Sequence, residues 1–234
     1  TAVNQAPLFD VYDSDGNTLG FYRTGQDRTI SAAAPAAGTY YVGVFDSTYH
    51  SNGNYSVTVN HTEGSTPGFE SEANDTLDTA DALTLGTAIT GQLKSDLDID
   101  IYEFTVNAAG TVTLAFDSPL SSSLSYFELE LHDSSDKRLN LYLTGSDQTF
   151  ETAVAAAGTY YVGITKSTYF TDAAYKLTVN HTAGSTAGFE SEANDTFATA
   201  DPLTLGTAMT GQLSTSADVD VYKFTVDAAG VITL

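Results

Sequence analysis

The chain repeats itself with a period of 120 residues. The nine residues GFESEANDT at 68–76 return unchanged at 188–196. The eight residues AAGTYYVG at 36–43 return at 156–163 with the same offset. Such a period means that one supersecondary design is used more than once, so the fold of one copy constrains the fold of the others.

The register of the repeat divides the chain into three parts. Residues 67–182 form one complete unit. Residues 1–63 match the second half of that unit, and residues 187–234 match its first half. We therefore expect a complete unit flanked by two halves. Residues 187–234 would complete residues 1–63 of the same chain or of a neighbouring chain.

Apolar residues alternate with polar ones over short stretches. In YFELELHD (126–133), Phe127, Leu129 and Leu131 share one face, and TVTLAF (111–116) alternates in the same way. A period of two is typical of half-buried antiparallel strands. Short strands separated by Gly and Asp turns predict an all-β sandwich, and no pattern of helical length is present.

The chain is strongly acidic, with a net charge of −22 and only eight Lys and Arg residues. This balance argues against nucleic acid and anionic membrane surfaces as partners. No apolar run approaches membrane-spanning length, so we expect no membrane insertion. Cysteine is absent, which excludes disulfides and thiolate zinc sites. We expect an extracellular bacterial protein, secreted or on the cell surface, that uses metal ions in place of disulfides.

Oxygen-bearing side chains gather in the repeated acidic segment and at the start of the next strand. In an extended segment, alternate residues share a face, so Glu70 and Glu72 lie on the same side. Asp98 and Asp100 are in phase with the core residues of their strand, where a carboxylate is costly unless paired or coordinated. Calcium takes six to eight oxygen ligands. Solvated loop acids are the alternative, but they would not explain this phase. The predicted calcium ligands are Glu70, Glu72, Asn74, Asp98 and Asp100, with Glu190, Glu192, Asn194, Asp218 and Asp220 in the last unit.

These motifs together resemble a known family. The ESEAND cluster, the D-x-D-x-Y-x-F pattern at 98–104 and the AGTYYV strand occur in the order found in the bacterial pre-peptidase C-terminal domain. That family is related to the collagen-binding domains of clostridial collagenases, and the resemblance covers essentially the whole chain. It implies a jelly-roll-like antiparallel β-sandwich, repeated here, and in some members calcium bound by the acidic segment. The family accompanies secreted peptidases, but this chain shows no catalytic domain and repeats its unit.

Three other features of the sequence bear on function. DSDGN at 13–17 looks like the start of an EF-hand loop, but the twelfth position is Thr24 and not Glu, so a hairpin turn is expected. No serine lies in a G-x-S-x-G elbow, and we expect no enzyme activity. Tyr160 and Tyr161 could stack on a sugar or a peptide, although tyrosine is also common in ordinary strands.

The sequence therefore predicts a structural repeat of an extracellular stalk, adhesin or filament, stiffened by calcium. Its partners would be copies of itself, joined head-to-tail by completing half-domains, unless the halves pair within one chain. The alternative is an accessory module of a secreted bacterial enzyme that binds carbohydrate or extracellular matrix protein. An excerpt from a continuous polypeptide would show the same register.

Overall fold

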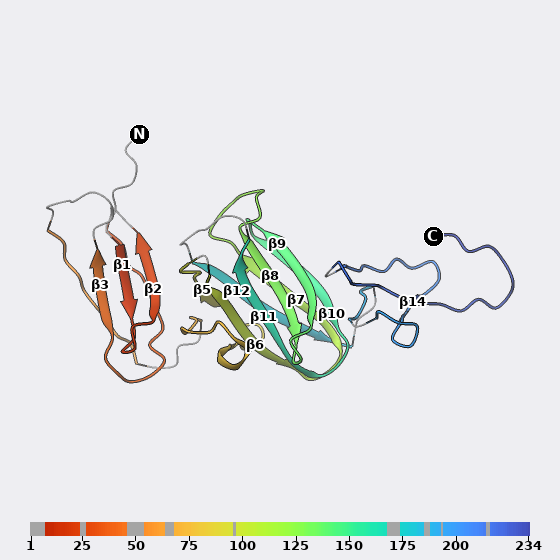
Figure 1. Ribbon diagram of the computed structural model, residues 1–234, viewed down its shortest axis with the longest axis horizontal. Coiled ribbons are helices and arrows are strands. Elements are labelled where there is room, and N and C mark those ends of the chain that lie inside the picture. The colour runs from red at the N-terminus through yellow and green to blue at the C-terminus, as the bar shows by residue number, and fades with distance from the viewer. Residues whose placement is uncertain are drawn as a thin grey trace.

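The computed structural model describes most of the chain and centres on a β-sandwich (Figure 1). The described residues are 8–23, 27–45, 54–63, 68–95, 97–167, 174–184, 188–192, 194–213 and 216–234. Two sheets pack face to face in the sandwich, and their strands come from the part of the chain between residues 81 and 183. The prediction of an all-β, antiparallel sandwich is confirmed.

One sheet has the order β10-β7-β12-β5 and the other β4-β6-β11-β8-β9. All neighbours are antiparallel except β4 and β6, which are parallel. A 3-10 turn, η1 (Leu77–Thr79), precedes β4. None of the described helical segments is long and apolar enough to cross a membrane. The strands are β4 (Asp81–Ala82), β5 (Ile89–Gly91), β6 (Ile99–Val106), β7 (Gly110–Asp117), β8 (Phe127–Asp133), β9 (Arg138–Thr144), β10 (Gln148–Val154), β11 (Gly158–Lys166) and β12 (Tyr175–Ala183).

The core lies between the two sheets and follows the alternation of the sequence. In β7, every second residue from Val112 to Phe116 is buried, and the residues between them are half-buried. In β6 the same alternation buries Tyr102 and Phe104. Burying one face of each strand removes apolar surface from water and fixes the strand register, since a slip of one residue would expose that face.

The flanking segments repeat parts of this architecture. The strands β1 (Leu8–Tyr12), β2 (Thr18–Arg23) and β3 (Tyr41–Phe45) form a sheet of order β2-β1-β3. With the 120-residue offset they match β8, β9 and β11, whose order is β9-β8-β11. At the other end, β13 (Asp201–Pro202) pairs in parallel with β14 (Tyr222–Lys223), as β4 does with β6. Figure 1 shows the two flanking segments at opposite ends of the sandwich.

Truncating a core residue tests the packing of the sandwich. Leu177 of β12 is fully buried, so Leu177→Ala should lower the free energy of unfolding by about 2–5 kcal/mol through lost apolar burial and the cavity left behind. Urea denaturation followed by circular dichroism measures the change. The control is Leu143→Ala on β9, where the side chain is half exposed and the loss should be under about 1 kcal/mol. Equal losses for the two variants would contradict this core.

Candidate metal centre

The segment that carries the repeated motif runs along the rim of the sandwich between β5 and β6. Phe69 forms a parallel bridge with Thr90, and the Glu70 N–H donates to the Thr90 carbonyl at 3.0 Å. On the other side, the Ile101 N–H donates to the Asn74 carbonyl at 3.1 Å. The segment is thus hydrogen-bonded to both sheets. As a result, every second side chain of the segment points into the sandwich.

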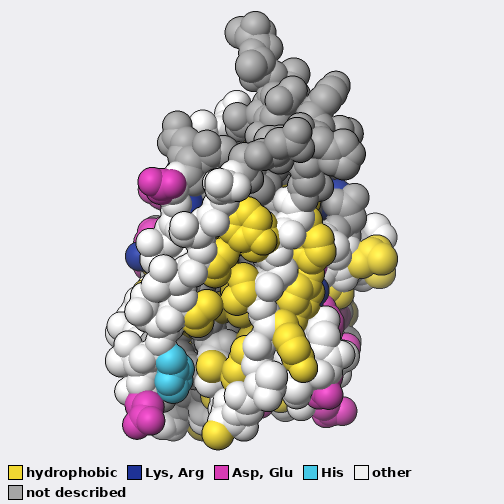
Figure 2. All heavy atoms as spheres, turned by 90° about the vertical axis from the view of Figure 1, so that its left-hand side faces the viewer, with side chains coloured by type: hydrophobic (Ala, Val, Ile, Leu, Met, Phe, Trp, Pro, Cys, Tyr) yellow, Lys and Arg dark blue, Asp and Glu magenta, His cyan; other side chains and the backbone are white. Residues whose placement is uncertain are grey.

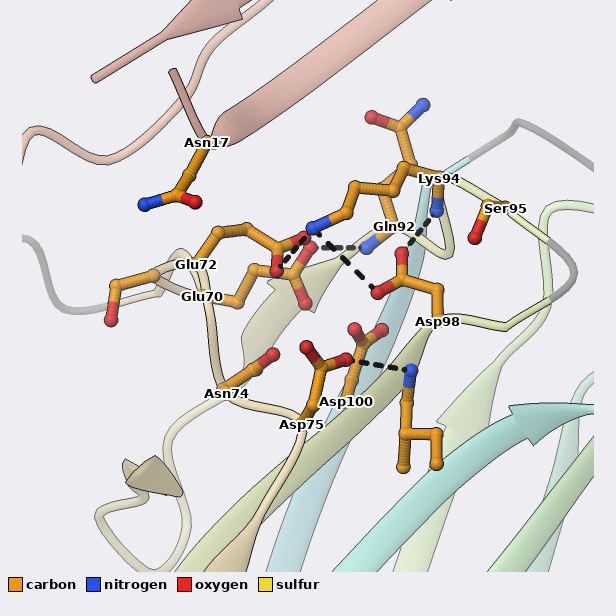
Figure 3. Close-up of polar contacts among 12 residues, drawn as sticks. Asn17, Glu70, Glu72, Asn74, Asp75, Gln92, Lys94, Ser95, Asp98 and Asp100 are labelled. Atoms are coloured by element: carbon orange, nitrogen blue, oxygen red, sulfur yellow. Dashed lines mark hydrogen bonds and ion pairs between the residues drawn. The ribbon is translucent and has the colours of Figure 1, made fainter. Parts of the chain in front are cut away.

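The five predicted ligands of the central unit, which we call the first acidic cluster, meet at this rim (Figure 3). One ligand oxygen each of Glu70, Glu72 and Asp100 lies within 4.8 Å of the others. Asp98 and Asp100, at the start of β6, are 4% and 0% exposed, so the phase expected from the core residues is the one observed. The cluster consists of Glu70, Glu72, Asn74, Asp98 and Asp100.

Several oxygens of the first acidic cluster have no donor. Asn74 Oδ1, Asp98 Oδ1 and Asp100 Oδ1 are buried and lack a hydrogen-bond partner among the described residues. Buried polar atoms normally find a partner, and an orphaned acceptor costs about 1–3 kcal/mol. Buried acceptors without donors, beside three carboxyl groups whose oxygens lie close together, therefore favour a positively charged ligand at this rim.

Asp81 holds the acidic segment in shape. Its Oδ2 accepts from the Ser71 N–H at 2.7 Å and from Asn74 Nδ2 at 3.2 Å, and its Oδ1 accepts from the Ser71 hydroxyl at 2.6 Å. Because the side-chain amide nitrogen of Asn74 donates to Asp81, the side-chain amide oxygen of Asn74 faces the cluster. Asp201 makes the same contacts with Ser191 and Asn194 in the last unit.

Two buried tyrosine hydroxyls connect the carboxylates. Tyr102 donates to Glu70 Oε2 at 2.8 Å, Tyr175 donates to Asp100 Oδ2 at 2.5 Å, and the two hydroxyl oxygens lie 2.7 Å apart. Two hydroxyl protons cannot serve three such contacts. All three contacts can be hydrogen bonds at once only when one of the two carboxyl groups carries a proton.

Burial also makes the carboxyl groups hold protons. It raises the pKa of both Glu70 and Asp100 well above the ordinary range, and the charges of neighbouring acids add to the effect. Burial raises the pKa of Glu72 to about 7, although Lys94 opposes the shift, and it raises the pKa of Asp98. A group of acids that resists ionisation in this way is suited to exchanging its protons for a metal ion.

One lysine partly neutralises the first acidic cluster. Lys94 Nζ lies 2.8 Å from Glu72 Oε2 and 3.8 Å from Asp98 Oδ1. Burial alone would lower the pKa of Lys94, but its hydrogen bond to Glu72 and the nearby acids raise it. A single ammonium group cannot balance four ionised carboxylates, so without a cation the cluster stays partly protonated.

The second acidic cluster keeps the same arrangement in the last unit. Glu190, Glu192 and Asp220 offer oxygens within 4.8 Å of one another, and so do Glu192, Asp195 and Asp218. Burial raises the pKa of Glu192 to about 7 and that of Asp220 to about 6, with neighbouring acids adding to both. The second acidic cluster consists of Glu190, Glu192, Asn194, Asp218 and Asp220.

Each cluster lies where one unit meets the next. Lys137, from the turn between β8 and β9, is 3.6 Å from Glu192 and 3.5 Å from Asp195 of the following unit. Its repeat mate at the first joint is Asn17, which Figure 3 shows pointing toward Glu72 from the preceding turn. The expected hairpin at 13–17 is confirmed, since β1 and β2 pair in antiparallel on either side of it.

The glycine of the repeated GQL motif is required by the buried acid. A Cβ at Gly91 would collide with the Glu70 carboxylate and with the hydroxyls of Tyr102 and Tyr175. A Cβ at Gly211 would collide with Glu190 in the same way. This glycine is therefore a position of close approach and not a turn residue.

The sequence missed the residues that support the clusters. The sequence analysis does not single out Asp81 and Asp201, although their common distance from the ESEAND motif is a usable signal. The two tyrosines predicted to bind a ligand differ in how deeply they are buried. Tyr160 is in the core, stacked on Phe104 with its hydroxyl bonded to the Ala156 carbonyl, whereas Tyr161 is half-buried beside Glu103 on the next strand.

The residues present fit a hard divalent cation. Carboxylate and amide oxygens are the ligands that calcium prefers, and at bond lengths of about 2.3–2.6 Å the ligand oxygens lie a few ångströms apart, as observed here. No sulfur or imidazole ligand lies in either cluster. Glu70, Glu72, Asn74, Asp98 and Asp100 would hold the ion, which would supply positive charge to buried oxygens that lack donors.

Comparison with known proteins finds a likeness among solved structures. No family model matches the chain, and no curated protein matches it. Among solved structures, the chain is similar to the pre-peptidase C-terminal domain of collagenase from Bacillus anthracis, with 25% sequence identity and a TM-score of 0.36. The likeness covers 43% of this chain and 94% of that one.

The raised pKa values predict how stability depends on pH. Between the ordinary value of 4.5 and about 7, the folded protein retains a proton on Glu72 that the unfolded chain has released. Without metal, the melting temperature should therefore fall as the pH rises through this window. Saturating calcium should reduce or reverse the fall, because it binds the ionised form.

Thermal melts followed by circular dichroism, with chelator and with calcium, measure this dependence. Glu72→Gln should flatten the metal-free curve, whereas Glu63→Gln, at an exposed position, should leave it unchanged. A metal-free melting temperature that rises between pH 5 and pH 7 would contradict the assignment of protons to the cluster.

Proposed function

We propose that the chain is a stretch of an extracellular structural protein, a stalk, adhesin or filament, in which bound calcium stabilises each unit at its joint with the unit before it. The protein acts without catalysis. The observation that carries the proposal is the convergence of buried oxygens, three of them without a hydrogen-bond partner among the described residues, at the rim where the preceding unit arrives.

A ligand that binds only the folded state stabilises that state by mass action. In this chain it would also relieve the repulsion among the buried carboxylates. Because the acidic segment directly follows the linker between units, an ion bound there holds the start of one unit close to the end of the previous one. An array built in this way is stiff when calcium is present and looser when it is removed.

Calorimetric titration with calcium tests the site. We expect two ions for each chain, one for each acidic cluster. Asp100→Asn, which keeps an acceptor for Tyr175 but removes a charge, should reduce the number to one, and the double variant with Asp220→Asn should bind none. The control, Asp117→Asn, alters an exposed acid of the same unit and should leave both sites intact. Absence of binding, or binding unchanged in the double variant, would contradict the proposal.

The flanking halves support a second part of the proposal, head-to-tail assembly. In the central sandwich, β12 from the second half of the unit lies between β7 and β5 from the first half. Its buried residues Tyr175, Leu177 and Val179 have as repeat mates Tyr55, Val57 and Val59, which are 68%, 43% and 70% exposed. Figure 2 shows hydrophobic side chains gathered on this end of the molecule.

The first half of a unit at the other end has the complementary surface. Val226 and Ile232 are about half exposed, whereas their mates Val106 and Val112 are fully buried. The partner we propose for residues 54–63 is therefore residues 188–234 of a second copy. Since Tyr175 donates to Asp100 within the central unit, Tyr55 of the first copy would donate to Asp220 of the second copy and complete its second acidic cluster.

Sedimentation velocity over a range of concentrations tests the assembly. The chain should form larger species as concentration rises in calcium, and chelator should reduce their size. Val59→Asp should block growth, because it places a charge where the mate Val179 is fully buried. Ser56→Asp adds the same charge on the outward side of the segment and should leave growth intact. A compact monomer under all these conditions would show that the halves do not join between chains.

A further inference from the structure

Each joint contains a glutamine whose side chain extends from its own unit to the preceding unit. Gln92 follows β5, and Gln212 is its repeat mate. The residue before Gln92 is the glycine that approaches Glu70, and the residue after it, Leu93, is buried at 2% exposure. With both neighbours fixed in the sandwich, the side chain of Gln92 points away from the carboxylates (Figure 3).

Both glutamines make the same pair of hydrogen bonds to the preceding unit. The Phe21 N–H donates to Gln92 Oε1 at 3.1 Å, and Gln92 Nε2 donates to the Phe21 carbonyl at 2.7 Å. At the second joint, the Leu141 N–H donates to Gln212 Oε1 at 3.3 Å, and Gln212 Nε2 donates to the Leu141 carbonyl at 2.7 Å. Phe21 and Leu141 are themselves repeat mates, so one contact is made twice.

The backbone that receives the glutamine belongs to the open edge of a sheet. Phe21 lies on β2 and Leu141 on β9, and each of these strands is outermost in its sheet. An edge strand presents N–H and C=O groups with no strand beside them, which invites pairing with another chain. A primary amide carries one acceptor and a donor in the same arrangement as a peptide group, so it can take the place of one residue of a neighbouring strand.

We propose that the open edge of β2 and β9 is the surface by which one unit binds the next, and that the group it binds is the glutamine side chain of the following copy of the repeat. The edge contact also specifies order. Only the first half of a unit carries this glutamine and only the second half carries the edge, so units join in one direction.

The glutamine is also attached to the acidic cluster. The Gln92 N–H donates to Glu70 Oε1 at 2.5 Å, and the Gln212 N–H donates to the Glu190 carboxylate. The backbone of one residue is thus held by a candidate calcium ligand while its side chain holds the neighbouring unit. This link between ion and joint rests on the proposed function, because a cation bound to Glu70 would fix the backbone from which the amide reaches out.

Amide hydrogen exchange of Phe21, measured by NMR on the full chain, tests the edge contact. Phe21 is the better reporter, because the Leu141 N–H also donates to Asn140 Oδ1. Without calcium, Gln92→Ala should accelerate Phe21 exchange by about tenfold or more. Gln92→Glu should do the same at unchanged side-chain size, since it sets an oxygen against the Phe21 carbonyl. Gln148→Ala, at an exposed position on β10, is the control and should have no effect.

Adding calcium distinguishes the two parts of the proposal, the edge contact and its link to the acidic cluster. In the unaltered chain it should slow Phe21 exchange further, and in Gln92→Ala it should bind with affinity within about twofold but leave Phe21 exchange unchanged. Phe21 exchange that is insensitive to both Gln92 substitutions overturns the edge contact. Calcium that binds without slowing Phe21 exchange overturns the link to the cluster. If calorimetry detects no calcium binding, the proposed function fails, and the calcium-free comparison still decides the edge contact.

Discussion

The burial of carboxylates at the rim of each sandwich is the constraint on which the rest of the structure depends. Taking an ionised carboxylate out of water is costly unless it is paired, and the first acidic cluster buries several of them beside one lysine. The chain offsets this cost in a specific way. Asp81 shapes the acidic segment, Gly91 makes room for Glu70, and two tyrosine hydroxyls donate hydrogen bonds to Glu70 and Asp100. Asn74, Asp98 and Asp100 each keep one buried oxygen that has no hydrogen-bond partner among the described residues.

The same constraint explains why the joint and the cluster occupy one place. The acidic segment follows the linker, so its ligands necessarily lie where the previous unit ends. That unit presents its β8–β9 turn, closed by the Asp133 carboxylate, and the open edge of β9. The turn carries Lys137 to the second acidic cluster, and the edge receives Gln212. A ligand at this position acts on the unit that follows the joint and on its attachment to the unit before it.

Much of this could be predicted from the sequence, because the informative patterns are local. Period-two alternation predicted the sandwich, and the phase of Asp98 and Asp100 with Tyr102 predicted that both acids are buried. The supporting contacts could not be predicted, because they join residues distant in the sequence. Tyr102 and Tyr175 are 73 positions apart, and the alternation within each strand predicts only that each faces the core. The contact of Gln92 with Phe21 depends on how two neighbouring units are placed relative to each other. The residue pattern within one unit does not predict that placement.

The two joints also differ, and the difference indicates which interactions matter most. Lys137 crosses the second joint, but it is 39% exposed and 3.5–3.6 Å from its partners, and ion pairs of this kind contribute little and are weakened by salt. Asn17 takes its place at the first joint and carries no charge. Both joints nevertheless keep the buried glutamate, its glycine and the glutamine bound to a backbone edge. The exposed charge is the part that varied between copies, while the buried acid and the edge contact stayed the same. The attachment between units therefore depends on the buried groups, whose interactions salt screens least.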